Sequence, residues 1–214
     1  MLHFPHDKVR MLPLILTVLF LLPGWVTAEV TKSRPFNAGD HFFYDIKWGI
    51  FKVGEAEMFI EEAGADLSGE LKYTLLVRTT SWADTFYTVR NRIESTTDAK
   101  VTRSLRFTQN QKEGSREREI VVTFDWDKKQ AQYSNYGEKL EPIDIKGNCH
   151  DPFSVLFAFR LEEFVLGKHI EIPVSDGKKS LMADIVVMER EQVKVKAGQF
   201  DCMRVRPDTK DLGG

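Results

Sequence analysis

The chain has 214 residues, with 30 lysine and arginine residues against 32 aspartate and glutamate residues, so its formal net charge is −2 at pH 7. Charges of both signs are interspersed, and no part of the chain provides the basic patch that nucleic-acid binding requires. This balance excludes a nucleic-acid-binding protein from the expected classes.

The first 28 residues have the pattern of a cleavable secretory signal. Basic residues precede an uncharged apolar segment, 11–22, and small residues follow up to Ala28. The segment is far shorter than the roughly 20 apolar residues that a membrane-spanning helix needs, although a single anchoring helix is the alternative. No cysteine follows it for lipid attachment. We therefore predict a signal peptide over 1–28, a single β-rich domain over 29–214, and a periplasmic protein that is not a lipoprotein.

Period-two alternation of apolar and polar residues dominates the remaining chain and predicts β-strands. In 41–50, every even position from 42 onward is aromatic or aliphatic, with Asp45 and Lys47 between them. Similar alternation predicts strands at 53–61, 71–78, 86–95, 101–109 and 116–126. Short turn sequences separate these strands, which favours antiparallel pairing as a meander. One face of the sheet is expected to pack while the other meets solvent.

One segment has a helical period instead. Asp151 is a favourable N-cap, Pro152 suits the first helical position, and apolar residues then recur at spacings of three and four. We predict a helix at about 152–165, ended by Gly167, and further strands from 169 to 206. The expected fold is mainly β: an antiparallel meander forming an open half-barrel, with the helix packed on its concave apolar face.

Three motifs are spaced across this predicted domain. They are FYDIKWGIFKVGEA at 43–56, HDPFSVLFAFR at 150–160, and AGQFDC at 197–202 followed by Val205 and Pro207. Together they resemble a family of bacterial exported proteins catalogued as domain of unknown function 3108. The resemblance implies a fold similar to lipoprotein carriers, with no established activity or functional residues. It also implies that this chain lacks the last strands of the domain, because similar members continue further.

Two cysteines, Cys149 and Cys202, are present. In an oxidising compartment they are candidates for a disulfide, which would contribute roughly 3–4 kcal/mol in the chain-entropy model because it closes a long loop. Two buried free thiols are the alternative, since the sequence does not show whether the Cβ atoms come within bonding distance.

The triplet Cys149-His150-Asp151 contains the residue types of nucleophilic catalysis. Neighbours in sequence point in different directions, whereas a catalytic base and its partners must converge on one point. Asp151 is moreover expected to cap the helix. The histidines His41, His150 and His169 lack the spacing of metal ligands. We therefore predict no catalytic residues, no metal, no cofactor, and no enzyme.

The aromatic residues have the greatest functional interest. They either fill the core between sheet and helix or line a groove that a curved sheet leaves open for an acyl chain or another apolar ligand. The candidate ligand-binding residues are Trp48, Phe59, Tyr73, Phe124, Trp126, Phe153 and Phe157. We predict a non-catalytic envelope protein, without a stable membrane span after signal cleavage, that binds a lipid or other apolar ligand.

The alternative function is an envelope scaffold or assembly partner that acts through a protein surface. Arginines alternate along neighbouring predicted strands and are expected on the polar face of the sheet, where either a partner or solvent would meet them. These residues are Arg78, Arg90, Arg92, Arg103, Arg106, Arg116 and Arg118.

Overall fold

The computed structural model describes residues 34–64 and 69–208, all within one compact unit that spans 34–214. The predicted signal peptide lies outside the described residues. No helix in the described part of the chain has the length and apolar character that crossing a membrane requires.

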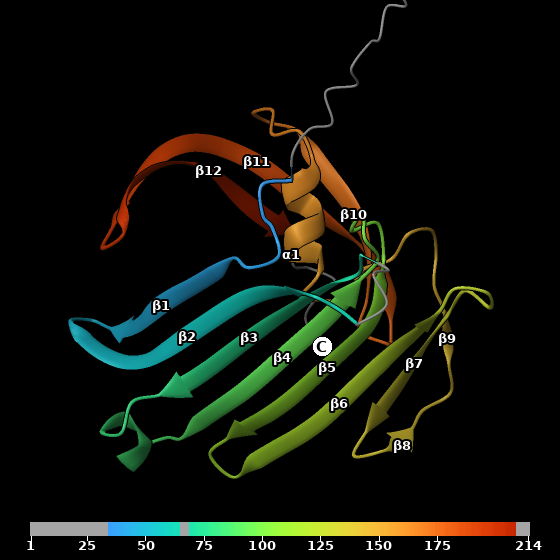
Figure 1. Ribbon diagram of the computed structural model, residues 1–214, viewed down its shortest axis with the longest axis horizontal. Coiled ribbons are helices and arrows are strands. Elements are labelled where there is room, and N and C mark those ends of the chain that lie inside the picture. Colours follow the sequence, from blue (N-terminus) through green and yellow to red (C-terminus); the bar gives the residue numbers. More distant parts are fainter. Residues whose placement is uncertain (1–33, 65–68, 209–214) are drawn as a thin grey trace, which may run out of the picture. The chain divides into compact units, whose positions relative to one another are not determined.

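A large antiparallel sheet contains nine strands, of which the first eight are neighbours in chain order, while β9 pairs with β7 (Figure 1). The strands are β1 (His41–Trp48), β2 (Phe51–Glu62), β3 (Leu71–Thr79), β4 (Val89–Thr97), β5 (Ser104–Glu113), β6 (Arg116–Asp125), β7 (Gln130–Asn135), β8 (Glu138–Lys139) and β9 (Ile143–Asp144). A 3-10 helix, η1 (Ala83–Thr85), joins β3 to β4. The sheet stays open because β1 has β2 as its only partner strand among the described residues. The predicted antiparallel meander and open half-barrel are confirmed.

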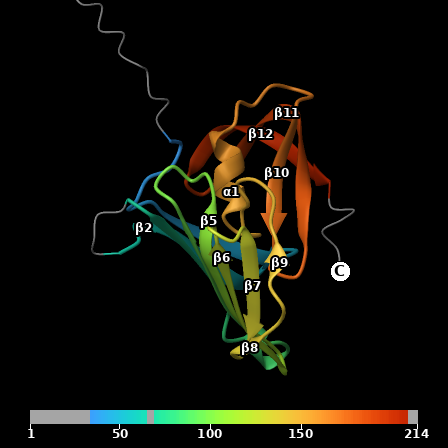
Figure 2. The same ribbon diagram turned by 90° about the vertical axis from the view of Figure 1, so that its right-hand side faces the viewer.

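A second, three-stranded antiparallel sheet follows, formed by β10 (His169–Ser175), β11 (Ser180–Val195) and β12 (Gly198–Asp208). The long β11–β12 hairpin curves away from the rest of this sheet (Figures 1 and 2). The sequence pattern predicts these strands but not their separation into a sheet of their own. The two sheets touch where the β10–β11 turn brings Gly177, at φ +80°, so close to Val122 and Tyr133 that a Cβ would lie 2.9–3.0 Å from their side chains.

The helical segment is shorter than the predicted range of 152–165. It consists of α1 (Val155–Ala158) and a 3-10 turn, η2 (Phe159–Leu161), after which Glu162 is extended. The chain turns back here because Phe164 packs edge-on against Phe159, with ring centroids 5.4 Å apart. Phe164 therefore does not continue the helical stripe that the sequence spacing suggests.

Two apolar clusters form the core. The larger one lies between the nine-stranded sheet and α1 and includes Phe36, Tyr73 and Phe157, which are almost completely buried. The smaller one joins Ala158 and Phe159 to the second sheet through residues such as Val187. The helical segment is thus buried between the sheets, and it divides the apolar interior into two parts.

Candidate ligand-binding face

The inner face of the nine-stranded sheet, on which α1 packs, is made of parallel rows of side chains that cross the strands. The strand register places Ile60, Tyr73, Ser95, Phe107, Val122 and Tyr133 next to one another in the first row. All six are buried. The helical segment covers this row, so it belongs to the core.

Aromatic contacts fill the space above the first row. Phe157 stacks on Tyr73 with ring centroids 3.8 Å apart and meets Phe36 and Phe153 edge-on at 5.3 and 5.6 Å. Phe124 is also buried in this cluster. Four of the candidate ligand-binding residues, Tyr73, Phe124, Phe153 and Phe157, therefore pack against the protein itself.

The other three candidates lie apart from one another. Trp126 stacks on Phe124 at the margin of the core and donates a hydrogen bond to the Ser104 carbonyl oxygen. Phe59 faces the opposite side of the sheet from its neighbour Ile60, and Trp48 is exposed beyond a register shift that follows Ile46. The seven candidates thus do not line one groove, because Phe59 faces outward and Trp48, which keeps the alternation of Tyr44 and Ile46, is exposed at the far end of β1.

A buried polar cluster positions the start of the helical segment. The Asp151 carboxylate accepts hydrogen bonds from the backbone N–H groups of Phe153 and Ser154 at 2.8 and 2.9 Å. Its other oxygen accepts from the hydroxyls of Ser95 and Ser104 at 2.5 and 2.7 Å. A buried carboxylate needs such donors to replace water. Asp151 therefore holds the turn at 152–154 and ties it to β4 and β5. The N-cap residue of α1 is Ser154, which makes no side-chain capping bond, rather than Asp151 as the sequence predicts.

Of the two alternatives for Cys149 and Cys202, a disulfide or free thiols, the structure has free thiols. Cys149 is buried in the larger core cluster, while Cys202 lies on β12 in the curved hairpin. Burial raises the pKa of the Cys149 thiol to about 12, so the reactive thiolate form is disfavoured at neutral pH. Its sulfur contacts the His150 carbonyl oxygen, and the Asp151 carboxylate is occupied by serine and backbone donors. The triplet has no nucleophile–base–acid arrangement.

His150 is expected to make stability depend on pH. Burial lowers the pKa of its ring below the ordinary value of 6.5, while Asp151 and Asp98 act in the opposite direction. The unfolded chain binds the proton more readily, so stability is complete above pH 6.5 and is lost as the pH falls below it, by at most about 1.4 kcal/mol per pH unit. Urea unfolding between pH 8 and 5 should show a smaller loss for His150→Gln. An equal loss in both proteins would contradict this assignment.

Beyond the first row, the inner face is only partly covered. The second row contains Met58, Leu75, Ile93, Gln109 and Ile120, and the third contains Tyr44, Ala56, Val77, Asn91, Gln111 and Arg118. The third row thus changes from apolar on β1–β3 to polar on β4–β6. The apolar part of the third row consists of Tyr44, Ala56 and Val77. We call these three residues, together with Ile46, Leu75 and Ile93, the open inner face. Tyr44 and Ile46 on β1 are 47% and 37% exposed.

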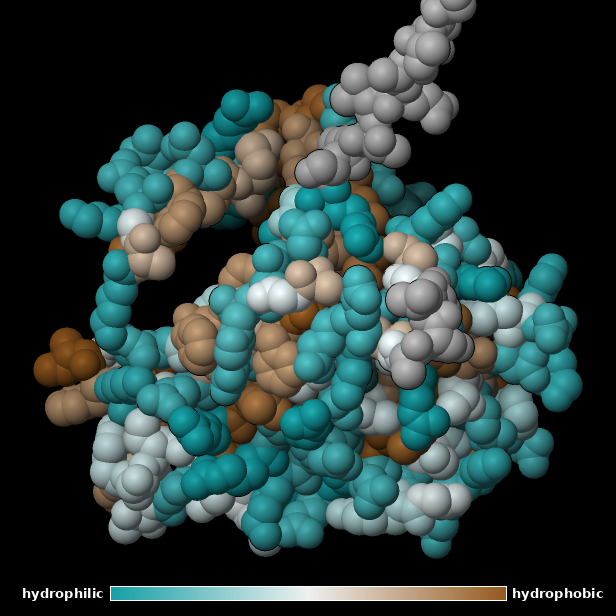
Figure 3. Space-filling model, viewed as in Figure 1, coloured by the Kyte–Doolittle hydropathy of each residue, from teal (hydrophilic) through white to brown (hydrophobic). Residues whose placement is uncertain are grey.

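The β11–β12 hairpin lies across from β1, and the surface is hollowed between them (Figure 3). At its tip, Lys196 Nζ lies 2.6 Å from the Asp45 carboxylate of β1. The hydrogen bonds from Lys196 and Lys52 hold the pKa of Asp45 down at about 2, so the ion pair is present at neutral pH. The hairpin and β1 thereby border the open inner face on its two sides.

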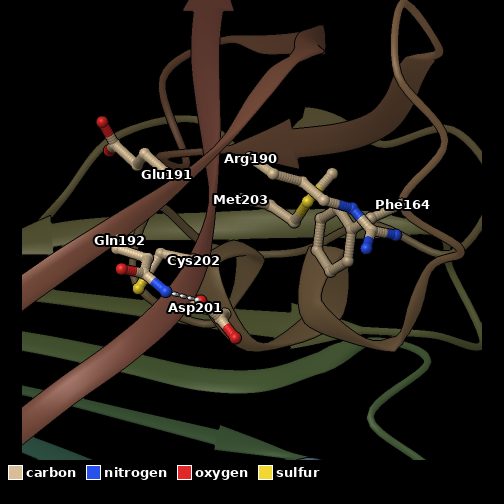
Figure 4. Close-up of a pocket in the computed structure, with 7 residues that line it drawn as sticks. All are labelled: Phe164, Arg190, Glu191, Gln192, Asp201, Cys202 and Met203. Carbon is tan, nitrogen blue, oxygen red and sulfur yellow. Dashed lines mark hydrogen bonds between the residues drawn. The ribbon is translucent and has the colours of Figure 1, made fainter.

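A pocket of about 500 Å³ lies against this hairpin (Figure 4). Phe164, Met203 and the Arg190 side chain lie close together in it, and the Gln192 amide donates to Asp201 at 3.1 Å. Among the described residues, no hydrogen bond or ion pair reaches the Arg190 guanidinium. A smaller pocket of about 250 Å³ lies between Pro152 and the second sheet. The larger pocket therefore combines the apolar side chains of Phe164 and Met203 with the Arg190 cation and with the carboxylates of Glu191 and Asp201.

The arginine rows are divided between the two faces. Arg78, Arg92 and Arg106 share the outer face with Thr74 and Glu94, whereas the register places Arg118 opposite Gln111 on the inner face. Arg78 and Arg92 pair with Glu55 and Glu94. The arginines thus do not form one continuous surface.

Comparison with known families gives one result. A family model described as "Protein of unknown function (DUF3108)" matches residues 44–214. The curated proteins and the solved structures gave no significant match. The matched range includes the open inner face, the helical segment and the curved hairpin.

Proposed function

This chain belongs to the DUF3108 family, and from its geometry we propose that it binds an apolar, chain-like ligand, such as the acyl chain of a lipid, in the bacterial envelope without catalysing a reaction. The observation that carries this proposal is the open inner face. Its side chains are apolar and project toward the hollow beneath the hairpin, yet the helical segment covers only the row beside them.

The size and chemistry of the adjoining pocket support the same ligand class. Pockets for small molecules typically measure about 300–1,000 Å³ and combine apolar walls with a few polar groups. The pocket beside the hairpin, at about 500 Å³, is within this range. Phe164 and Met203 would contact an apolar chain. Arg190 would attract an anionic head such as a carboxylate or phosphate, beside the Glu191 and Asp201 carboxylates that line the same pocket. An amphiphile whose single acidic head binds at Arg190 matches this lining.

The export signal predicted over 1–28 places this activity in the envelope, where lipids are the abundant chain-like apolar molecules. The interior chemistry favours binding over catalysis. The Cys149 thiol is held protonated, and the Asp151 carboxylate is fully engaged by serine and backbone donors. Neither group is free to act on a ligand in the hollow.

A matched pair of variants tests the proposal. Val77→Arg places a charge in the third row of the inner face, while Leu76→Arg places the same charge on the outer face of the same strand. Since a charge is costly in an apolar site, we expect Val77→Arg to weaken binding of a fluorescent fatty acid about tenfold or more. Leu76→Arg should bind as the wild type does.

Native mass spectrometry of the exported protein, followed by solvent extraction, should also yield an acyl-containing molecule. Thermal melts of both variants establish that each is folded. The proposal fails if the wild-type protein binds no probe and releases no lipid, or if the two folded variants bind the probe equally.

A further inference from the structure

Exposed aromatic side chains gather at one end of the nine-stranded sheet, opposite the end that the helical segment covers. The antiparallel register brings the β1–β2 turn and the β3–β4 connection to this end, because Trp48 pairs with Phe51, and Arg78 with Arg90. We call the cluster the aromatic rim; it consists of Trp48, Ile50, Phe51, Trp82, Phe86 and Tyr87. Trp48, Ile50 and Phe86 are 78%, 87% and 81% exposed.

Three rings of the rim, those of Phe51, Trp82 and Phe86, are in contact with one another. Phe51 meets Trp82 edge-on with ring centroids 6.3 Å apart, and Trp82 meets Phe86 in the same way at 6.3 Å. The Trp82 indole N–H donates to the Lys52 carbonyl oxygen at 3.0 Å, which fixes the η1 connection against β2. The turn that carries Ile50 begins at Gly49, whose φ of +59° allows the tight reversal. The Trp82 hydrogen bond and the turn at Gly49 therefore position the two connections that carry the rim.

These side chains have no role in the core or in the proposed ligand site. None of the rim residues lines either of the two pockets described above. The rim side chains project from turns at the end of the sheet. Side chains that project from turns in this way can be buried by insertion into a membrane surface.

The charges around the rim suit a phospholipid surface. Segments 45–55 and 78–90 carry four basic residues, Lys47, Lys52, Arg78 and Arg90, against three acidic ones, Asp45, Glu55 and Asp84. All three carboxylates are ion-paired, at 2.6–2.9 Å, with Lys52, Arg78, Arg90 or Lys196. Among the described residues, Lys47 forms no ion pair. The acidic groups thus do not repel lipid phosphates, and one cation is available to them.

We propose that the aromatic rim docks on the surface of a phospholipid membrane, with Trp48, Ile50 and Phe86 inserted into the headgroup region. Tryptophan and other aromatic residues favour this region because their apolar rings are buried while their polar edges stay hydrated. When the rim is inserted, the basic residues of segments 45–55 and 78–90 would lie at the depth of the lipid phosphates. The proposal does not depend on the ligand of the inner face.

Vesicle flotation tests the docking. The full chain is expressed in an exporting bacterial host and purified, and its mass establishes whether 1–28 have been removed. We expect it to float with vesicles of phosphatidylethanolamine and phosphatidylglycerol. The triple variant Trp48→Ser, Ile50→Ser, Phe86→Ser should bind at least about tenfold more weakly, because three apolar anchors are lost. The control is Val165→Ser, Leu166→Ser, which removes two apolar residues outside the rim that are 51% and 57% exposed.

Insertion is tested at the rim itself with brominated lipids, which quench indole fluorescence only at short range. The wild-type protein should be quenched more than Trp48→Phe, which retains docking but lacks one rim indole. Sedimentation and a thermal melt of the triple variant establish its size and folding. Equal flotation of the triple variant and the control overturns the proposal. So does a wild-type dimer that becomes monomeric in the triple variant, because a second copy would then cover the rim.

Discussion

Replacement of Asp151 by alanine is expected to lower the free energy of unfolding by about 3–5 kcal/mol, because it leaves a set of buried donors unpaired. The carboxylate is completely buried and accepts four hydrogen bonds, two from backbone N–H groups and two from the hydroxyls of Ser95 and Ser104. Its loss frees the first turn of the helical segment from β4 and β5. Equilibrium urea unfolding of the variant gives the measurement.

Asp176 provides the matched control for this variant. Its carboxylate also accepts hydrogen bonds from two consecutive backbone N–H groups, those of Lys178 and Lys179 at 2.9 Å, but it lies in the β10–β11 turn and is only partly buried. Asp176→Ala should therefore cost only about 1 kcal/mol. If Asp151→Ala costs no more than Asp176→Ala, the buried serine contacts contribute nothing and the assigned role is wrong.

Phe157→Ala is expected to destabilise the protein by about 3–5 kcal/mol, as deletion of a large buried aromatic side chain typically does. The ring is almost fully buried and contacts Tyr73, Phe36 and Phe153, so its loss leaves a cavity between the sheet and α1. Chemical denaturation measures the cost. Leu156→Ala, at a half-exposed neighbouring position of the same helix, should cost less than about 1 kcal/mol.

The Phe157 experiment also separates core from ligand site. If Phe157 lined the ligand groove, its truncation would reduce ligand binding while changing stability little. A large loss of stability, with fluorescent fatty-acid binding retained below the unfolding midpoint, is the expected result. Loss of binding without loss of stability would instead place the ligand against the helical segment.

The types of secondary structure could be predicted because they depend on residues that are close together in the sequence. Strand 41–48 follows from strict alternation, and the helical segment begins near Asp151-Pro152 because a carboxylate there caps free N–H groups whatever the distant chain does. The end of the segment was less predictable. Phe164 has the spacing of a helical stripe, but the chain turns after Leu161, and Phe164 packs with Phe159 against the second sheet.

The ligand-binding residues were harder to predict from the sequence, because the presence of an aromatic residue does not show which face of the sheet its side chain occupies. Phe59 and Ile60 are neighbours, yet one faces outward and the other is buried in the core. Trp48, by contrast, keeps the alternation of Tyr44 and Ile46, but it lies at the end of β1, where its side chain is 78% exposed. A change of one residue in register reverses the face of every later side chain in a strand.

The sequence by itself determined the β-rich class, the antiparallel order of the first strands and the position of the helical segment. All of these depend on periodicity and capping within a few residues. Only the tertiary structure decided that the last three strands form a separate sheet, that Tyr73 and Phe157 belong to the core, and that Cys149 and Cys202 remain free. It also decided that the open inner face and the aromatic rim stay uncovered. These features depend on which distant segments meet, and short-range patterns do not contain that information.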